Sequence, residues 1–218
     1  MYELIVFDWD GTLMDSEATI VRCLQMAARD LGVAEPAARR ARDVIGLGLH
    51  EAVASLFPKA DEIQVDALAQ QYRKHFLSKD REPSPLFPGA RELLQNLASR
   101  DYFLAVATGK SRRGLDMELA HTGLGELFHV TRCADEAFSK PHPQILLDVL
   151  DHLGMEKQQA LVIGDTQYDM QMAANAGSDA IGVSFGVHTP ERLREYGALT
   201  VVDDLQQVVH WLEEARPD

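Results

Sequence analysis

The chain has 218 residues, of which 46% are hydrophobic and 25% charged, so it is long enough for one sizeable core and has the composition of a soluble globular protein. Its net charge of −13 argues against nucleic acid as a partner, because binding to phosphate backbones needs clustered lysine and arginine. No run approaches the roughly 18 apolar residues of a membrane span, and the N-terminus lacks the pattern of a signal peptide. We therefore expect a cytoplasmic protein without a membrane partner. The two cysteines, Cys23 and Cys133, match no metal spacing and are expected to pack as small apolar residues.

The first predicted element is a short buried strand over residues 4–7, because Leu4-Ile5-Val6-Phe7 is a continuous apolar run. The strand ends in two acids, Asp8 and Asp10, whose side chains point to the same side of an extended chain. Gly11 then allows a sharp turn. Carboxylates held this close stay ionised only if a cation or hydrogen bonds compensate, so the pattern indicates a metal site or a proton-transfer task.

Residues 16–82 are predicted to be helical, without a convincing strand. After an N-cap at Asp15-Ser16, the first helix should end at Gly32 and bury one face, formed by Ile20, Leu24, Ala27 and Leu31. Further helices are predicted over 36–44, from the break at Gly46-Leu47-Gly48 to Phe57, and over about 61–79, the last with Val65, Leu68, Tyr72 and Phe76 on one face.

The rest of the chain alternates between helices and strands. Pro83, Pro85 and Pro88 predict a linker, since closely spaced prolines disfavour both helix and central strand. After it, helices are predicted over 90–100, from 111, over 141–153, over about 166–176 and up to Ala215, and strands over 103–107, 128–131, 160–163, 180–183 and 199–202. This alternation predicts an α/β fold with a doubly wound, mostly parallel sheet.

The first strand belongs with this second half, so the helical segment is an insertion after it. We therefore predict two domains, an α/β core of residues 1–15 and 83–218 and a helical domain of residues 16–82. The charges agree with this division, because acidic and basic side chains balance within 16–82 and the net charge of −13 comes from the remainder. The two parts should have physically different surfaces.

Polar side chains follow several of the predicted strands, where ligands bind in open parallel sheets. Thr108-Gly109 follows the second strand, and Lys140 precedes Pro141, which suits the first position of a helix and keeps Lys140 in a loop. Asp165 follows the strand over 160–163 at a predicted N-cap, and Asp169 comes one helical turn later. Carboxylates in this number suit a hard cation such as Mg²⁺, and a hydroxyl with an ammonium suits phosphate oxygens. Together with Asp8 and Asp10, these groups describe phosphoryl transfer through an aspartyl-phosphate.

These residues resemble the four motifs of the haloacid dehalogenase-like (HAD) hydrolase superfamily, in the family's order. The motifs are Asp8-Trp9-Asp10-Gly11-Thr12, Thr108, Lys140-Pro141 and Gly164-Asp165-Thr166-Gln167-Tyr168-Asp169. The resemblance covers essentially the whole chain, and the helical insertion is similar to the family's cap domain. It implies a Rossmann-like core and a helical cap.

The resemblance also implies roles for the residues. Asp8 is the expected nucleophile, and Asp10 the group that protonates the leaving alcohol and later deprotonates water. Lys140, Thr108 and the Gly109 amide would hold the transferring phosphoryl group. Mg²⁺ would bind through Asp8, the backbone carbonyl of Asp10, and Asp165. As supporting residues, Thr12 would stabilise the first-motif turn, and Asp169 would support the metal site or orient Lys140.

Single positions separate the activities of the superfamily. Asp10 argues against dehalogenases, which lack this aspartate, and against phosphonatases, which replace it with a small residue. Ile20 stands where phosphosugar mutases resembling β-phosphoglucomutase carry a histidine. The remaining expectation is a phosphatase of the phosphoglycolate-phosphatase type, a monomer or homodimer acting on a small phosphorylated metabolite. Gly109 departs from the Asn that many members have there, which leaves the substrate open.

Other activities stay as alternatives: a pyrophosphatase or phosphosugar mutase of the same fold, and, from another class, a phospho-aspartate signalling module. Signalling domains of that type are shorter and have no helical insertion after the first strand. Three further segments have open roles. The loop Gly46-Leu47-Gly48 with His50 either faces the site or is a helix break, Arg112 and Arg113 either reach substrate or are solvated, and residues 182–188 either line the site or form a plain turn.

Overall fold

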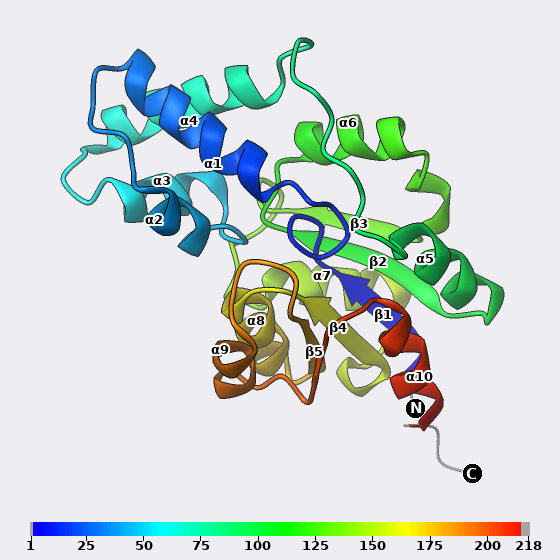
Figure 1. Ribbon diagram of the computed structural model, residues 1–218. Helices are drawn as coiled ribbons and strands as arrows, with labels where there is room; N and C mark the ends of the chain where they lie inside the picture. Colours follow the sequence, from blue (N-terminus) through cyan, green and yellow to red (C-terminus); the bar gives the residue numbers. More distant parts are fainter. Residues whose placement is uncertain (1, 215–218) are drawn as a thin grey trace.

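The central strand of the sheet is the first one in the sequence, β1. The computed structural model describes residues 2–214 and contains a six-stranded sheet in the order β3-β2-β1-β4-β5-β6, with every neighbouring pair parallel (Figure 1). The strands are β1 (Leu4–Phe7), β2 (Phe103–Thr108), β3 (Val130–Cys133), β4 (Ala160–Gly164), β5 (Asp179–Val183) and β6 (Val201–Val202). From β1 the chain adds β2 and β3 on one side, and it then returns to add β4, β5 and β6 on the other side. The predicted doubly wound α/β fold is therefore confirmed.

Alternation of side chains along β1 divides the core into two layers. Ile5 and Phe7 pack on one face and Leu4 and Val6 on the other, as the period of two in a strand requires. The first face is covered by α5 (Ala90–Ser99), α6 (Arg112–Thr122) and α10 (Gln206–Glu214). The second is covered by α7 (Gln144–Leu153), α8 (Gln167–Ala176) and α9 (Pro190–Glu195). Both faces are thus buried, which is why the central strands β1 and β4 are apolar throughout.

The helical insertion has a hydrophobic core of its own. It consists of α1 (Glu17–Asp30), α2 (Ala38–Asp43), α3 (Leu49–Leu56) and α4 (Glu62–Phe76). Buried side chains from these helices and their loops pack together, among them Ile20, Leu24, Val44, Val53, Leu56, Leu68 and Phe76. Figure 1 shows the four helices, coloured blue to cyan, gathered beyond the carboxyl ends of the strands.

The two connections between the insertion and the core run side by side. The Asp15 amide donates to the Pro85 carbonyl at 2.9 Å, and the Phe87 amide donates to the Leu13 carbonyl at 2.9 Å. The chain therefore enters and leaves the insertion at one place, which is the geometry of a hinge between two bodies.

Several predicted boundaries were wrong. The helix predicted from Pro141 begins at Gln144, because Pro143 occupies the position before its first turn. The strand predicted over 128–131 lies two residues later, as β3, and α9 was not predicted at all. Leu31 is not part of a buried face: α1 ends at Asp30, and Leu31 is 38% exposed.

The predicted end of the last helix at Ala215 lies outside the described residues. Both cysteines are buried and unpaired, as expected for packing residues. Within residues 2–214, no helix combines the length and the apolar character needed to cross a membrane.

Candidate active site

Asp8 lies at the carboxyl end of β1 and is almost completely buried. Lys140 forms an ion pair with it, with Nζ 2.9 Å from Oδ1. Apart from this contact, neither carboxylate oxygen has a hydrogen-bond partner among the described residues. Burial raises the pKa of Asp8 to about 7, although the charge of Lys140 opposes the rise. An acid this deep and this poorly compensated is typical of a site that is completed by a ligand.

Three carboxylates converge at this point. Asp8, Asp165 and Asp169 each offer an oxygen, and these oxygens lie within 4.8 Å of one another. Asp165 accepts hydrogen bonds from the Thr12 hydroxyl at 2.9 Å and from the Val187 amide at 2.8 Å. Even so, burial and the neighbouring charges of Asp8 and Asp169 raise the pKa of Asp165 well above its usual range. The cluster holds more negative charge than its protein partners compensate.

The donor set fits a hard divalent cation. Among the described residues the cluster consists of carboxylates alone, and the Oδ2 oxygen of Asp8 has no hydrogen-bond partner there. Mg²⁺ prefers such ligands and keeps part of its water shell, so it needs only one or two protein carboxylates. A divalent charge would also lower the repulsion within the cluster.

Lys140 lies between two of these carboxylates. Its Nζ donates to Asp169 Oδ1 at 2.6 Å in addition to the ion pair with Asp8. Burial lowers the pKa of Lys140, but the charges of Asp169 and Asp8 more than offset this, so the pKa is raised and the ammonium stays charged. Asp169 is fixed in turn, since the Thr166 hydroxyl and amide donate to its Oδ2.

Asp10, the second acid of the first motif, lies in a different environment from Asp8. Ser16 donates its hydroxyl proton to Asp10 Oδ1 at 2.5 Å, and Lys110 Nζ lies 3.0 Å from the same oxygen. Lys110 also pairs with Glu118 of α6 at 3.3 Å, and Trp9 Nε1 donates to that carboxylate at 2.6 Å. The carboxyl group of Asp10 is therefore held by hydrogen bonds and lies outside the three-carboxylate cluster.

Thr108 and Gly109 complete the core side of the site. Thr108 is buried at the end of β2, and its hydroxyl accepts a hydrogen bond from the Lys110 amide at 3.2 Å. A Cβ at Gly109 would lie 2.5 Å from the Leu47 carbonyl oxygen and 2.6 Å from that of Gly46. The insertion thus rests directly on this position, and only glycine leaves room for the contact.

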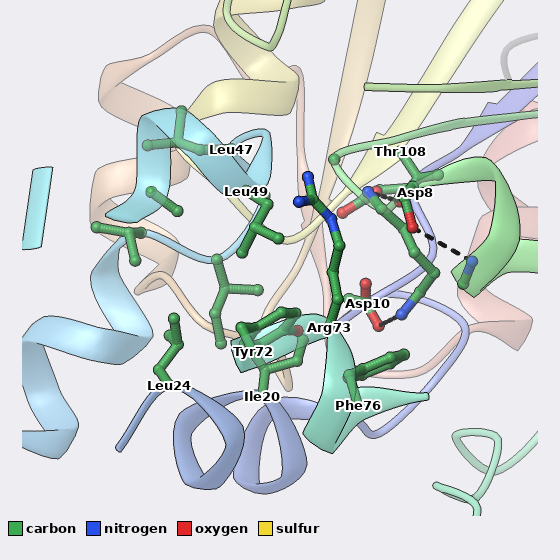
Figure 2. Close-up of a pocket in the computed structure, with 18 of the residues that line it drawn as sticks. Asp8, Asp10, Ile20, Leu24, Leu47, Leu49, Tyr72, Arg73, Phe76 and Thr108 are labelled. Atoms are coloured by element: carbon green, nitrogen blue, oxygen red, sulfur yellow. Dashed lines mark hydrogen bonds and ion pairs between the residues drawn. The ribbon is translucent and has the colours of Figure 1, made fainter. Parts of the chain in front are cut away.

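A pocket opens between these strand ends and the insertion (Figure 2). Asp8, Asp10, Thr108 and Gly109 line its core side. Its other walls come from α1, α3, α4 and the loop after α2: Ile20, Leu24, Val44, Ile45, Gly46, Leu47, Leu49, Ala52, Tyr72, Arg73, Phe76 and Leu77. A buried set of acids at one end of a pocket whose other end is mainly apolar is a candidate active site.

The structure shows which of the three segments with open roles lie at the pocket. Gly46 and Leu47 line the pocket, whereas His50 pairs with the exposed Asp66 at 2.6 Å. Arg112 is held by Glu136, Asp116 and Thr131 and is not among the pocket residues. The loop over residues 182–188 borders the site, through the hydrogen bond from Val187 to Asp165.

One local prediction at the site was wrong. The N-cap of α8 is Thr166, not Asp165, and Asp169 is the third helical residue, whose carboxylate accepts hydrogen bonds from the Thr166 amide and hydroxyl. Ser16 is the N-cap residue of α1, as predicted, but its hydroxyl donates to Asp10 and does not cap the helix.

Lys110, Glu118 and Ser16 were missed by the sequence analysis. Glu118 carried a detectable signal, since it lies three residues after the buried Leu115 on the apolar face of α6, where an acid requires a partner.

Comparisons with known proteins find similarity over most of the chain. The family model described as "Haloacid dehalogenase-like hydrolase" matches residues 5–183. "Probable phosphatase IndB" of Dickeya dadantii is 36% identical over 214 residues, covering 96% of this chain and 93% of that protein. A phosphoglycolate phosphatase of Rhodospirillum rubrum is 31% identical, covering 100% and 93%. Among solved structures, a hydrolase from Pseudomonas syringae has a TM-score of 0.88 and 25% identity, with 100% of both chains covered.

Proposed function

The chain belongs to the haloacid dehalogenase-like hydrolases and is a phosphatase of that family, and we propose that it hydrolyses phosphate monoesters of small metabolites with Mg²⁺, through a phosphoryl group carried on Asp8. The observation that carries this proposal is the Asp8 carboxylate. It is buried, is paired with the Lys140 ammonium and with no other side chain among the described residues, and lines a pocket that also contains Asp10.

In the first half-reaction a carboxylate oxygen of Asp8 attacks phosphorus. The bond between phosphorus and the alcohol oxygen breaks, and Asp10 gives its proton to the leaving oxygen. In the second half-reaction Asp10 takes a proton from water, whose oxygen attacks phosphorus and releases phosphate and free Asp8. Asp10 suits both steps because Ser16 and Lys110 hold its carboxyl group apart from the three-carboxylate cluster.

Phosphate oxygens would be bound by the Thr108 hydroxyl, the Gly109 amide and the Lys140 ammonium, which lie at the ends of β2 and the loop before α7. Asp8, Asp165 and the backbone carbonyl of Asp10 would hold Mg²⁺, which when bound supplies positive charge against the phosphate oxygens. Asp169 keeps Lys140 in place through their 2.6 Å contact. Thr12 orients Asp165.

We further propose that residues 16–82 form a cap domain over a core of residues 1–15 and 83–218. The contact of Gly46 and Leu47 with Gly109 supports this, because it brings the insertion onto the phosphate-binding residues. A closed cap excludes bulk water during phosphoryl transfer, and its opening admits water and releases product.

The proposal is tested with p-nitrophenyl phosphate as a generic substrate. Wild type should release nitrophenol repeatedly when Mg²⁺ is present and stop when it is chelated. Asp8→Asn should lower kcat by about 10³-fold or more, because the amide cannot act as the nucleophile. Equal rates for wild type and Asp8→Asn would refute the proposal, and a single turnover without further release would favour a phospho-aspartate switch.

A further inference from the structure

The pocket is apolar on every wall that the insertion provides, apart from one side chain. Its lining from α1, α3, α4 and the preceding loop consists of aliphatic, aromatic and glycine residues, with Arg73 as the exception. Tyr72 contributes an aromatic surface and is stacked on Phe76, with ring centroids 5.6 Å apart. The empty volume, including the mouth, is about 710 Å³. A substrate consisting of little more than a phosphate group would leave this wall in contact with water.

Arg73 has no hydrogen bond or ion pair with any residue in the described part of the chain, although it lines the pocket and is partly buried. Figure 2 shows its side chain extending from α4, with the guanidinium turned towards the end of the pocket where Asp8 and Thr108 lie. An unpaired guanidinium beside a phosphate site is suited to bind phosphoryl oxygens.

The charges at the site make this contact useful. Asp8, Asp165 and Asp169 oppose the single ammonium of Lys140, which leaves two negative charges for a divalent cation to cancel. Lys110 is already paired with Asp10 and Glu118. A phosphoryl dianion entering the site then adds two negative charges, and Arg73 is the cation by which the insertion reduces this excess.

We propose that the substrate is a phosphate monoester whose alcohol part carries an apolar, ring-sized group, which packs against Tyr72, Leu49 and Leu24, while Arg73 binds a phosphoryl oxygen. This inference rests on the proposed phosphatase function and specifies its substrate class. Burial of apolar surface in the pocket then favours esters with a large alcohol part over small ones. The reason is that it adds binding free energy only when the alcohol part is large enough to displace water from the wall.

The test compares esters of primary alcohols with similar leaving groups: ethyl phosphate, 2-phosphoglycolate and benzyl phosphate, each with Mg²⁺. The kcat/KM for benzyl phosphate should exceed the other two by about tenfold or more. Equal values, or a preference for 2-phosphoglycolate, would overturn the inference while the phosphatase function stood. Absence of Asp8-dependent hydrolysis of all three esters and of p-nitrophenyl phosphate would instead refute the function itself.

Substitution of the wall provides a second measurement. Leu49→Ser should lower the ratio of kcat/KM between benzyl and ethyl phosphate by about fivefold, since a polar side chain replaces an apolar contact. Leu49 is only half-buried, so the fold should tolerate the change. Ile63→Ser is the matched control, because Ile63 is 79% exposed on α4 and is not among the pocket residues. An unchanged ratio in Leu49→Ser would contradict the proposed packing.

Arg73 is tested with both esters and with inorganic phosphate as a competitive inhibitor. Arg73→Gln should lower kcat/KM for ethyl and benzyl phosphate by the same factor, about tenfold or more, and should raise the inhibition constant of phosphate. Arg73→Lys should recover part of both losses. Lys74→Gln is the control, since Lys74 is the exposed neighbour on α4. Unchanged phosphate inhibition in Arg73→Gln would exclude the phosphoryl contact.

Discussion

Asp8 and Asp10 are two residues apart and lie in different surroundings. Asp8 contacts Lys140 alone among the described side chains, whereas Asp10 accepts a short hydrogen bond from Ser16 and pairs with Lys110. Different environments give two carboxyl groups different tasks in one site. This difference supports the proposed division between a nucleophile and a proton carrier.

Ser16 provides a test of that division, because its buried hydroxyl fixes the orientation of Asp10. Ser16→Ala should lower kcat by about tenfold for ethyl phosphate, whose leaving oxygen needs a proton. The loss should be much smaller for p-nitrophenyl phosphate, whose leaving group needs none. Ser99→Ala, at an exposed helix end, serves as the control. Equal losses for the two substrates would indicate that Ser16 acts on something other than proton transfer.

At the same scale, the sequence predicted where the polar residues lie better than what holds them. The rule that ligands bind at strand ends pointed to Asp8, Thr108 and Asp165, and the structure brings these positions to one edge of the sheet. Lys110 and Glu118 were missed, because their pairing depends on how α6 packs, which local patterns do not contain.

Among the elements, the loop after α2 packs closely against Gly109 at the site. Gly109→Ala places a Cβ against the main-chain carbonyls of Gly46 and Leu47, which cannot rotate away as a side chain would. We expect kcat/KM to fall by about 10- to 100-fold, since small displacements of a catalytic site are costly.

The control for this change is Gly125→Ala, because the nearest atom to its added Cβ is 3.9 Å away. The midpoint of urea unfolding should be similar for the two variants. A loss of kcat/KM in Gly109→Ala would then reflect impaired closure of the insertion on the core and not lower stability. Wild-type kcat/KM in Gly109→Ala would mean that the loop need not approach Gly109 during catalysis.

The sequence predicted which segments are helices and which are strands more reliably than it predicted the residues at which they begin and end. Periodicity identified the helices of the insertion and the strands of the sheet, because each buries one face or both. The start of α7 was misplaced, because Pro141 and Pro143 both satisfy the preference for the start of a helix and only the second stands next to it. The short helix α9 buries a single residue, Leu193, and so left little pattern to detect.

For the whole molecule, the proposed binding of Mg²⁺ at the carboxylate cluster predicts that stability depends on Mg²⁺. A ligand that binds only the folded state adds about 2.7 kcal/mol at a concentration 100 times its dissociation constant, so the Tm of wild type should rise with Mg²⁺. In Asp165→Asn most of that rise should be lost, whatever the Tm of the metal-free variant.

Asp151→Asn is the matched control, since Asp151 is exposed on α7 and is not one of the three carboxylates of the cluster. Differential scanning calorimetry over a series of Mg²⁺ concentrations measures both variants. An equal increase of Tm in Asp165→Asn and Asp151→Asn would exclude Asp165 as a ligand.

At this scale the sequence predicted the division into an α/β sheet and a helical insertion, since composition and periodicity change between them. The apolar pocket and the position of Arg73 could not be predicted, because they arise where four helices meet the strand ends. Tyr72 and Phe76 were predicted as one buried face of α4, and part of that face lines the pocket.

The central claim is that Asp8 carries the phosphoryl group, and it is tested most directly by acid-quenching the enzyme during turnover of benzyl phosphate with Mg²⁺. Mass spectrometry of the digested protein should find one phosphoryl group on the peptide that contains Asp8, and none in Asp8→Asn. A phosphoryl group on another residue, or steady turnover by Asp8→Asn, would contradict the account.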